Sequence, residues 1–214
     1  MKRALVLGCS HAAGSEMTVD PSQDFLSRMT LDQRSHYERE NSFAAIIARR
    51  LGYSVNNQSV PGGSNDAIFR IFQQHLAELT PNDIVIVAWT GANRSEVQHY
   101  QTQAWVPFAP GSLDIIDIEY RSFLKHWIAL NTGPNWAELN KSKNIIALNA
   151  IAQQHNIRVI NLDSLWPVST VTGNWPLAVD FWTWCLDHKF PCTDLGHFYQ
   201  SAHLAYAELA MKQL

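Results

Sequence analysis

The stretch NDIVIVAWTG, residues 82–91, constrains the fold of this chain more than any other part of the sequence. It is apolar and rich in β-branched residues, and Gly91 closes it, which is the pattern of a strand buried on both faces. Two shorter runs, Arg3–Gly8 and Ile157–Leu162, have the same apolar character. Strands buried on both faces are typical of parallel sheets, because crossover helices cover both sides. We therefore expect a parallel sheet with residues 82–91 near its centre.

Helical patterns separate these strands. Residues Asn41–Leu51 have helical periodicity and stop before Gly52, and Ser64 is placed to cap a further helix. A weaker strand is expected at Tyr53–Val60. Further helices are expected at Leu113–Leu130, Trp136–His155 and Leu195–Leu214. Alternation of strands and helices predicts an α/β sandwich with a mostly parallel sheet.

The chain is long enough for one sizeable core, with 214 residues of which 46% are hydrophobic. We expect a single domain over residues 1–214, with a helical and loop insert at about 95–140 and an aromatic loop at about 163–193. Within these, residues 105–111 (WVPFAPG) and Ser164–Pro191 are expected to be loops.

The charge and composition of the chain limit the classes of partner that it can bind. The net charge is −3 and the basic residues are scattered, which argues against a nucleic-acid surface. The apolar run Ala4–Gly8 is shorter than the roughly 7–15 residues of a secretion signal, and no run approaches the roughly 18 that cross a bilayer. The three cysteines show no CxxC spacing, although a Cys185–Cys192 bridge stays open. We expect a cytoplasmic protein with no membrane partner.

Polar residues and glycines follow the predicted strands, where ligands of parallel α/β sheets bind. The residues to inspect are Ser10, Gly62, Gly63, Asn93, Asp194 and His197. Together they supply a hydroxyl, backbone amides, a side-chain amide, a carboxylate and an imidazole. Acyl transfer needs this set: a base to activate the hydroxyl, a carboxylate to orient the base, and N–H donors for the developing negative charge.

Each residue also has an ordinary structural explanation. Ser10 is a common type of turn residue, and the sequence around Gly62 reads as a turn followed by a helix cap. Asn93 fits a turn, and Asp194 with His197 fits the first turn of a helix. Cys9 is an alternative nucleophile, but only with a depressed pKa. The combination of residues, and no single one of them, indicates catalysis.

Four segments of the chain resemble the sequence blocks that define SGNH (GDSL-type) hydrolases, and they occur in the same order as in that family. Gly8-Cys9-Ser10 with Gly14 resembles GDSxxxG, and NQSVPGGSN at 57–65 resembles the second block. Gly91-Ala92-Asn93 is similar to the start of GxND, and residues 194–197 (DLGH) are similar to DxxH. The GCSH sequence is also similar to a variant found in phage-encoded members, which would place the protein in a host cell or a virion.

The resemblance implies a flavodoxin-like three-layer α/β/α fold and a role for each block. Ser10 is then the nucleophile, His197 the general base and Asp194 its orienting acid. The backbone N–H groups of Ser10 and Gly62, with the Asn93 side chain, form the oxyanion hole. Cys9 and Arg94 replace aspartates of the family pattern, and Phe198 stands where a proline often follows the histidine.

Five further residues are candidates for lining the substrate site: His11, Gly63, Arg94, Trp182 and Trp184. Aromatic rings in the 163–193 segment could bind a sugar or an acyl group, and the alternative is a lid that packs on the core. Arg94 could meet an anionic substrate or form a surface salt bridge. The histidines lack the spacing of metal ligands, so no metal and no cofactor is expected.

The sequence therefore predicts an SGNH-type serine esterase that removes a short acyl or O-acetyl group from a carbohydrate-like substrate through an acyl-enzyme on Ser10. The alternative is a non-catalytic glycan-binding or virion-associated structural module that retained the hydrolase fold.

Overall fold

A sheet of four parallel strands forms the centre of the molecule, in the order β2-β1-β3-β6. The computed structural model describes residues 2–17, 29–99, 101–110, 118–131, 133–166 and 175–214. The strands are β1 (Arg3–Gly8), β2 (Ser54–Asn57), β3 (Ile84–Trp89) and β6 (Arg158–Asp163). β1 and β3 hold the two inner positions, and all their residues except Arg3 are buried. This confirms the parallel sheet with residues 82–91 in its interior.

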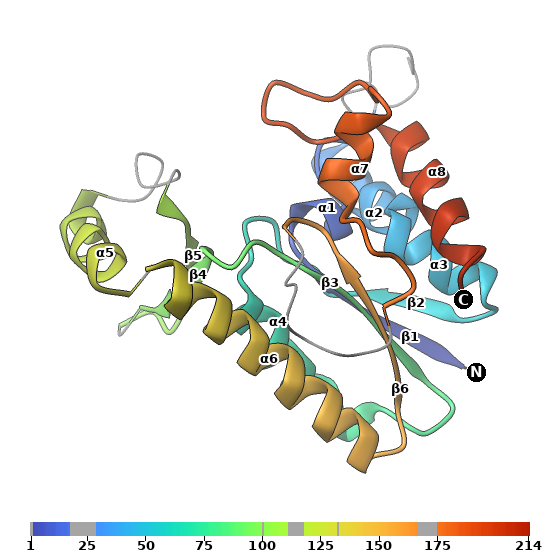
Figure 1. The fold of residues 1–214 in the computed structure, drawn as a ribbon, viewed down its shortest axis with the longest axis horizontal. Coiled ribbons are helices and arrows are strands. Elements are labelled where there is room, and N and C mark those ends of the chain that lie inside the picture. The colour runs from blue at the N-terminus through green and yellow to red at the C-terminus, as the bar shows by residue number, and fades with distance from the viewer. Residues whose placement is uncertain (1, 18–28, 100, 111–117, 132, 167–174) are drawn as a thin grey trace.

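Helices cover both faces of the sheet and give three layers (Figure 1). On one face lie α4 (Asn65–His75) and α6 (Pro134–Gln154), which pack on Leu5, Leu7 and Val87. The other face carries α1 (Ser10–Ala13), α2 (Leu31–Asn41), α3 (Phe43–Arg50), α7 (Phe181–Asp187) and α8 (Gln200–Met211). Because side chains alternate along a strand, β1 and β3 contribute to both cores. The three-layer α/β/α fold is confirmed.

Local sequence signals explain where several helices begin. The Ser64 side chain accepts a hydrogen bond from the backbone N–H of Ala67 and so caps α4, as the sequence predicts. Ser42 caps α3 in the same way. These caps fix where two of the covering helices start relative to the carboxyl ends of β1 and β2.

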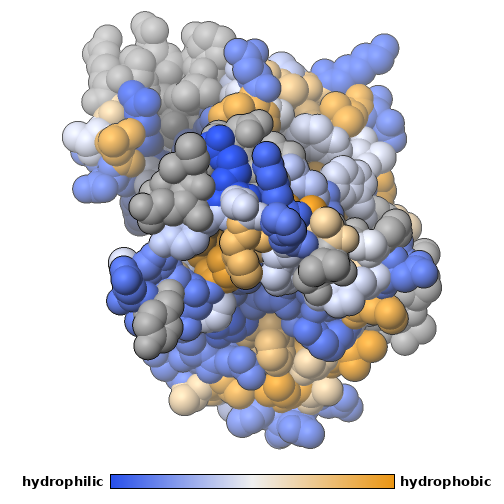
Figure 2. Space-filling view, turned by 90° about the vertical axis from the view of Figure 1, so that its left-hand side faces the viewer, coloured by the Kyte–Doolittle hydropathy of each residue, from blue (hydrophilic) through white to orange (hydrophobic). Residues whose placement is uncertain are grey.

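The insert differs from the prediction in one respect. Residues 105–111 are not all loop, because β5 (Trp105–Phe108) pairs with β4 (Ser95–Gln98) in an antiparallel hairpin. α5 (Ile118–Asn131) follows, and the expected helical residues 113–117 lie outside the described residues. The hairpin and α5 project away from the sheet (Figure 1). Figure 2, which views the molecule from that side, shows hydrophobic residues in small groups among hydrophilic ones.

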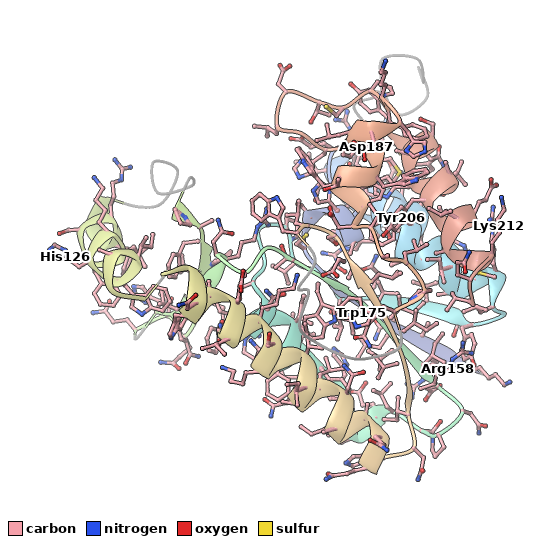
Figure 3. The ribbon with its side chains drawn as sticks, viewed as in Figure 1. His126, Arg158, Trp175, Asp187, Tyr206 and Lys212 are labelled. Atoms are coloured by element: carbon pink, nitrogen blue, oxygen red, sulfur yellow. The ribbon has the colours of Figure 1, made fainter. Side chains whose placement is uncertain are left out.

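The aromatic segment also differs from the prediction, because it contains the helix α7. Asp180 caps this helix by accepting a hydrogen bond from Thr183 N–H, and an aspartate before an apolar run is a helix start signal already present in the sequence. Tyr206 of α8 lies next to α7 and donates to the Val179 carbonyl (Figure 3). The last helix begins at Gln200, later than expected, because Gly196, with φ +80°, belongs to a turn. Part of the predicted loop, residues 167–174, lies outside the described residues.

Candidate active site

The carboxyl ends of the four parallel strands lie at one edge of the sheet, and three of the predicted blocks begin there. β1 leads into Ser10, and β3 leads into the turn at Gly91. The segment after β2 stays beside β1, since Val60 N–H donates to the Gly8 carbonyl at 3.0 Å. The blocks around residues 10, 62 and 93 therefore share one edge, as the sequence predicts.

Ser10 starts the single-turn helix α1 and is almost fully buried, at 4% exposed. Two glycines allow the tight connection. A Cβ on Gly8 would lie 2.9 Å from the Ala88 carbonyl oxygen, so only glycine lets β1 approach β3 this closely at its end. Gly14 ends α1 with φ +73° and packs against the Glu38 carbonyl. The Ser10 hydroxyl forms no hydrogen bond with any described residue, His197 included, and such pairs are often loose without substrate.

The glycine pair after β2 provides one available donor. Gly63 N–H is already used, because it donates to the Val60 carbonyl at 2.8 Å. Gly62, with φ +74°, donates to none of the described residues, and Pro107 of β5 lies beside it. The hairpin of the insert thus borders this part of the edge. The role of Gly62 in an oxyanion hole stays a prediction.

The turn after β3 is held by Asn65, a residue that the sequence analysis missed. Its side chain accepts from Thr90 N–H at 3.0 Å and donates to the Thr90 carbonyl at 3.2 Å. Asn65 is the first residue of α4 and is 1% exposed. A polar side chain buried there needs hydrogen-bond partners, but the sequence does not indicate that they lie 25 residues further on.

Asn93 follows in the same turn, where Arg94 N–H donates to the Gly91 carbonyl. Its Oδ1 atom is buried and has no hydrogen-bond partner among the described residues, and a Cβ on Gly91 would meet it at 3.1 Å. The ring of Trp166 also packs against Gly91. The Asn93 amide is therefore placed at the edge but is not used to hold the turn together.

A buried ion pair secures the segment after β6. Lys141 Nζ lies 2.8 Å from Asp163 Oδ1 and also donates to the Trp166 carbonyl at 2.9 Å. Burial raises the pKa of Asp163 to about 6, although Lys141 opposes the shift. Lys141 thus links α6 to the residue that covers Gly91.

His197 stands on a turn at residues 193–197, far from β1 in the sequence. Gly196 N–H donates to the Thr193 carbonyl at 2.9 Å, and His197 N–H donates to Thr193 Oγ1 at 3.2 Å. The ring lies against the first block, with its centroid 5.4 Å from that of His11. The structure therefore brings His197 next to the residue that follows Ser10.

The carboxylate beside His197 belongs to Glu16. His197 Nδ1 lies 2.9 Å from Glu16 Oε2, and the Thr193 hydroxyl donates to the same oxygen at 2.6 Å. Partial burial acts to raise the pKa of Glu16, but the hydrogen bonds from Thr193 and His197 outweigh it and lower that pKa. Glu16 was not among the predicted site residues; it follows the first block by two residues, and only the fold shows what it contacts.

The expectation that Asp194 orients His197 differs from the structure. Asp194 and Leu195 occupy the outer corners of the turn closed by the Gly196-to-Thr193 hydrogen bond, and both are exposed. The Asp194 carboxylate hydrogen bonds to none of the described residues. Three residues of separation would let the two side chains meet in a helix, but residues 193–197 form a turn instead.

Of the other residues predicted to line the substrate site, His11 and Trp182 lie beside the His197 turn, whereas Trp184 packs elsewhere. His11 is 3% exposed and packs among the rings of Phe181, Trp182 and His197, so Trp182 lies beside the site. Burial is the main reason why the pKa of His11 is lowered well below its usual value, with further contributions from His197, His203 and Arg94. Trp184 packs instead on Tyr206, away from the ring of His11.

Arg94 is half-buried. It forms no salt bridge with any described acidic residue, so the surface salt bridge given as an alternative for it is not formed among the described residues. The three cysteines are free, and the Cys185–Cys192 bridge left open by the sequence is not formed. Cys9 is fully buried. In the part of the chain that the structure describes, no three His, Cys, Asp or Glu residues gather as a metal site, and no helix could cross a membrane.

Comparison with solved structures identifies similar folds. The chain aligns over its full length with a protein described as lipolytic and of the G-D-S-L family, from Desulfitobacterium hafniense DCB-2, with 13% identity, a TM-score of 0.50 and complete coverage of that chain. It also aligns over its full length with TesA, with 13% identity, a TM-score of 0.56 and 98% coverage of that chain. The chain shares their fold. No family model and no curated protein matches the sequence.

Proposed function

We propose that the protein is an SGNH-type serine esterase in which Ser10 is the nucleophile and His197 the general base. The observation that carries the proposal is the position of the His197 ring against the turn that holds Ser10, 5.4 Å from the ring of His11. The likeness of the fold to a G-D-S-L protein supports the same assignment.

The proposed reaction has two steps. Ser10 Oγ attacks the ester carbonyl while His197 Nε2 takes its proton, and that proton then passes to the leaving alcohol. Water repeats the sequence on the acyl-enzyme and releases the acid. Donors at Gly62 and Asn93 would stabilise the negative oxygen of each tetrahedral intermediate.

For the substrate we propose a short acyl or O-acetyl group on a carbohydrate-like molecule. Trp182 beside His11 supports this, because a flat ring can pack on a sugar face.

Labelling with a fluorophosphonate tests the nucleophile. We expect mass spectrometry to locate the label on Ser10, and Ser10→Ala to remove both the label and the hydrolysis of p-nitrophenyl acetate, a loss of at least about 10³-fold. Ser15→Ala, at the next serine of the chain, is the matched control and should still react. A folded wild-type protein that takes no label would contradict the proposal and favour a glycan-binding module.

A further inference from the structure

Glu16 is fixed in place by the turn that carries His197. Its Oε2 atom accepts one hydrogen bond from Thr193 Oγ1 at 2.6 Å and contacts His197 Nδ1 at 2.9 Å. Both partners come from the same five-residue turn, so the carboxylate position and the ring orientation are determined together. These short contacts are typical of hydrogen bonds to an ionised group.

The backbone around Glu16 explains how the side chain reaches this turn. Gly14 and Glu16 both adopt left-handed conformations, with φ +73° and φ +61°. Met17 follows, fully buried, and its N–H donates to the Gly14 carbonyl at 3.1 Å. A left-handed glutamate is uncommon, and such positions persist only where the surroundings hold them. Here the buried Met17 and the two hydrogen bonds on the carboxylate do so.

An ionised carboxylate at this position has a chemical consequence. It can only accept hydrogen bonds, so the neutral imidazole of His197 must carry its proton on Nδ1. The Nε2 lone pair is then free to take a proton from Ser10. A carboxylate does this work for the base of a Ser-His-acid triad, and it also stabilises the imidazolium that forms.

We infer that Glu16, in place of the aspartate of the DxxH sequence, is the carboxylate that orients His197, so that nucleophile and acid come from one segment of the chain and are six residues apart. The inference rests on the proposed function. Asp194 is exposed at the corner of the turn and has no catalytic part in this arrangement.

A pair of alanine variants tests the assignment by kinetics. Glu16→Ala should lower kcat/KM for p-nitrophenyl acetate by about 10³-fold or more, because the ring loses its orienting acceptor. Asp194→Ala removes the same kind of group from the position that the family pattern indicates, and should change kcat/KM by less than about threefold. Added formate should restore part of the activity of Glu16→Ala only. Comparable losses in both variants, or a loss confined to Asp194→Ala, would overturn the inference.

A measurement on the unmodified protein keeps the test independent of activity and of how the variants fold. Long-range ¹H–¹⁵N NMR identifies which ring nitrogen of neutral His197 carries the proton. We expect Nδ1 in the wild type and in Asp194→Ala, with a shift toward Nε2 in Glu16→Ala. A wild-type proton on Nε2 would overturn the inference even if Ser10 reacts with the fluorophosphonate. Absence of labelling with the proton on Nδ1 would instead count against the proposed function alone.

Discussion

The turn that carries Ser10 and the turn that carries His197 are held in place by different forces. Ser10 follows a buried strand, and glycines at 8 and 14 let the backbone pack closely against β3 and against Glu38. The His197 turn lies outside the sheet, and hydrogen bonds of Thr193 and Glu16 shape it. The comparison teaches that Ser10 is positioned by packing and His197 by polar contacts, so substitutions in the two turns should have different consequences.

The largest expected effect is on the turn that carries Ser10, which close packing holds in place. Gly14→Ala should lower the free energy of unfolding by about 3 kcal/mol or more, because a left-handed alanine is strained and its Cβ would also press on the Glu38 carbonyl carbon at 2.9 Å. Gly52→Ala is the matched control, since Gly52 has φ +83° with nothing within 4 Å. It should lose only about 1 kcal/mol. Urea unfolding measures both, and equal losses would show that packing does not hold the Ser10 turn.

An intermediate effect is expected on the turn that carries His197, which hydrogen bonds hold in place. Thr193→Val keeps the side-chain shape but removes the hydroxyl that donates to Glu16, so kcat/KM should fall by about tenfold while the free energy of unfolding changes by about 1 kcal/mol or less. Thr183→Val, whose hydroxyl bonds to none of the described residues, is the control and should behave like wild type. If Thr193→Val lowers the free energy of unfolding by several times about 1 kcal/mol but leaves kcat/KM unchanged, the two turns are not held differently.

The smallest effect concerns pH. His203 of α8 accepts from Phe43 N–H at 3.1 Å, and mainly because of burial its pKa is lowered to about 3. Neutral His203 therefore stabilises the fold above about pH 6.5, and this contribution is lost as the pH falls toward 3. The contribution of Asp163 changes with pH in the opposite direction, because its pKa is raised to about 6 in the folded protein. Protonated Asp163 stabilises the fold below pH 3.8, and that contribution is lost as the pH rises through about 6.

His203→Asn keeps an acceptor for Phe43 but cannot titrate, so its urea midpoint should fall less than the wild-type midpoint between pH 7 and pH 4. The exposed His188→Asn serves as the control and should follow the wild-type curve. Identical curves for all three proteins would mean that His203 does not couple α8 to α3 in the way described.

The features that the sequence predicted are those set by neighbours in the chain. Apolar runs identified β1 and β3, and a serine before an apolar helix identified the cap of α4. The hairpin β4–β5 escaped prediction because β5 has only 4 residues and contains Pro107, and a proline inside a short run argues against a strand. Glu16 meets His197 across 181 residues, and no local spacing rule reports such a contact. The DxxH spacing points to Asp194, but in the turn at residues 193–197, where Gly196 has φ +80°, that carboxylate is exposed, and no local spacing reveals the contact of His197 with Glu16.

Asn65 has a consequence for how the edge of the sheet can move. Its amide binds both the N–H and the C=O of Thr90, which imitates the two-point pairing between neighbouring strands. The first residue of α4 and the loop beyond β3 are thereby tied together at Thr90. A displacement of α4 would therefore be passed on to the segment that carries Asn93.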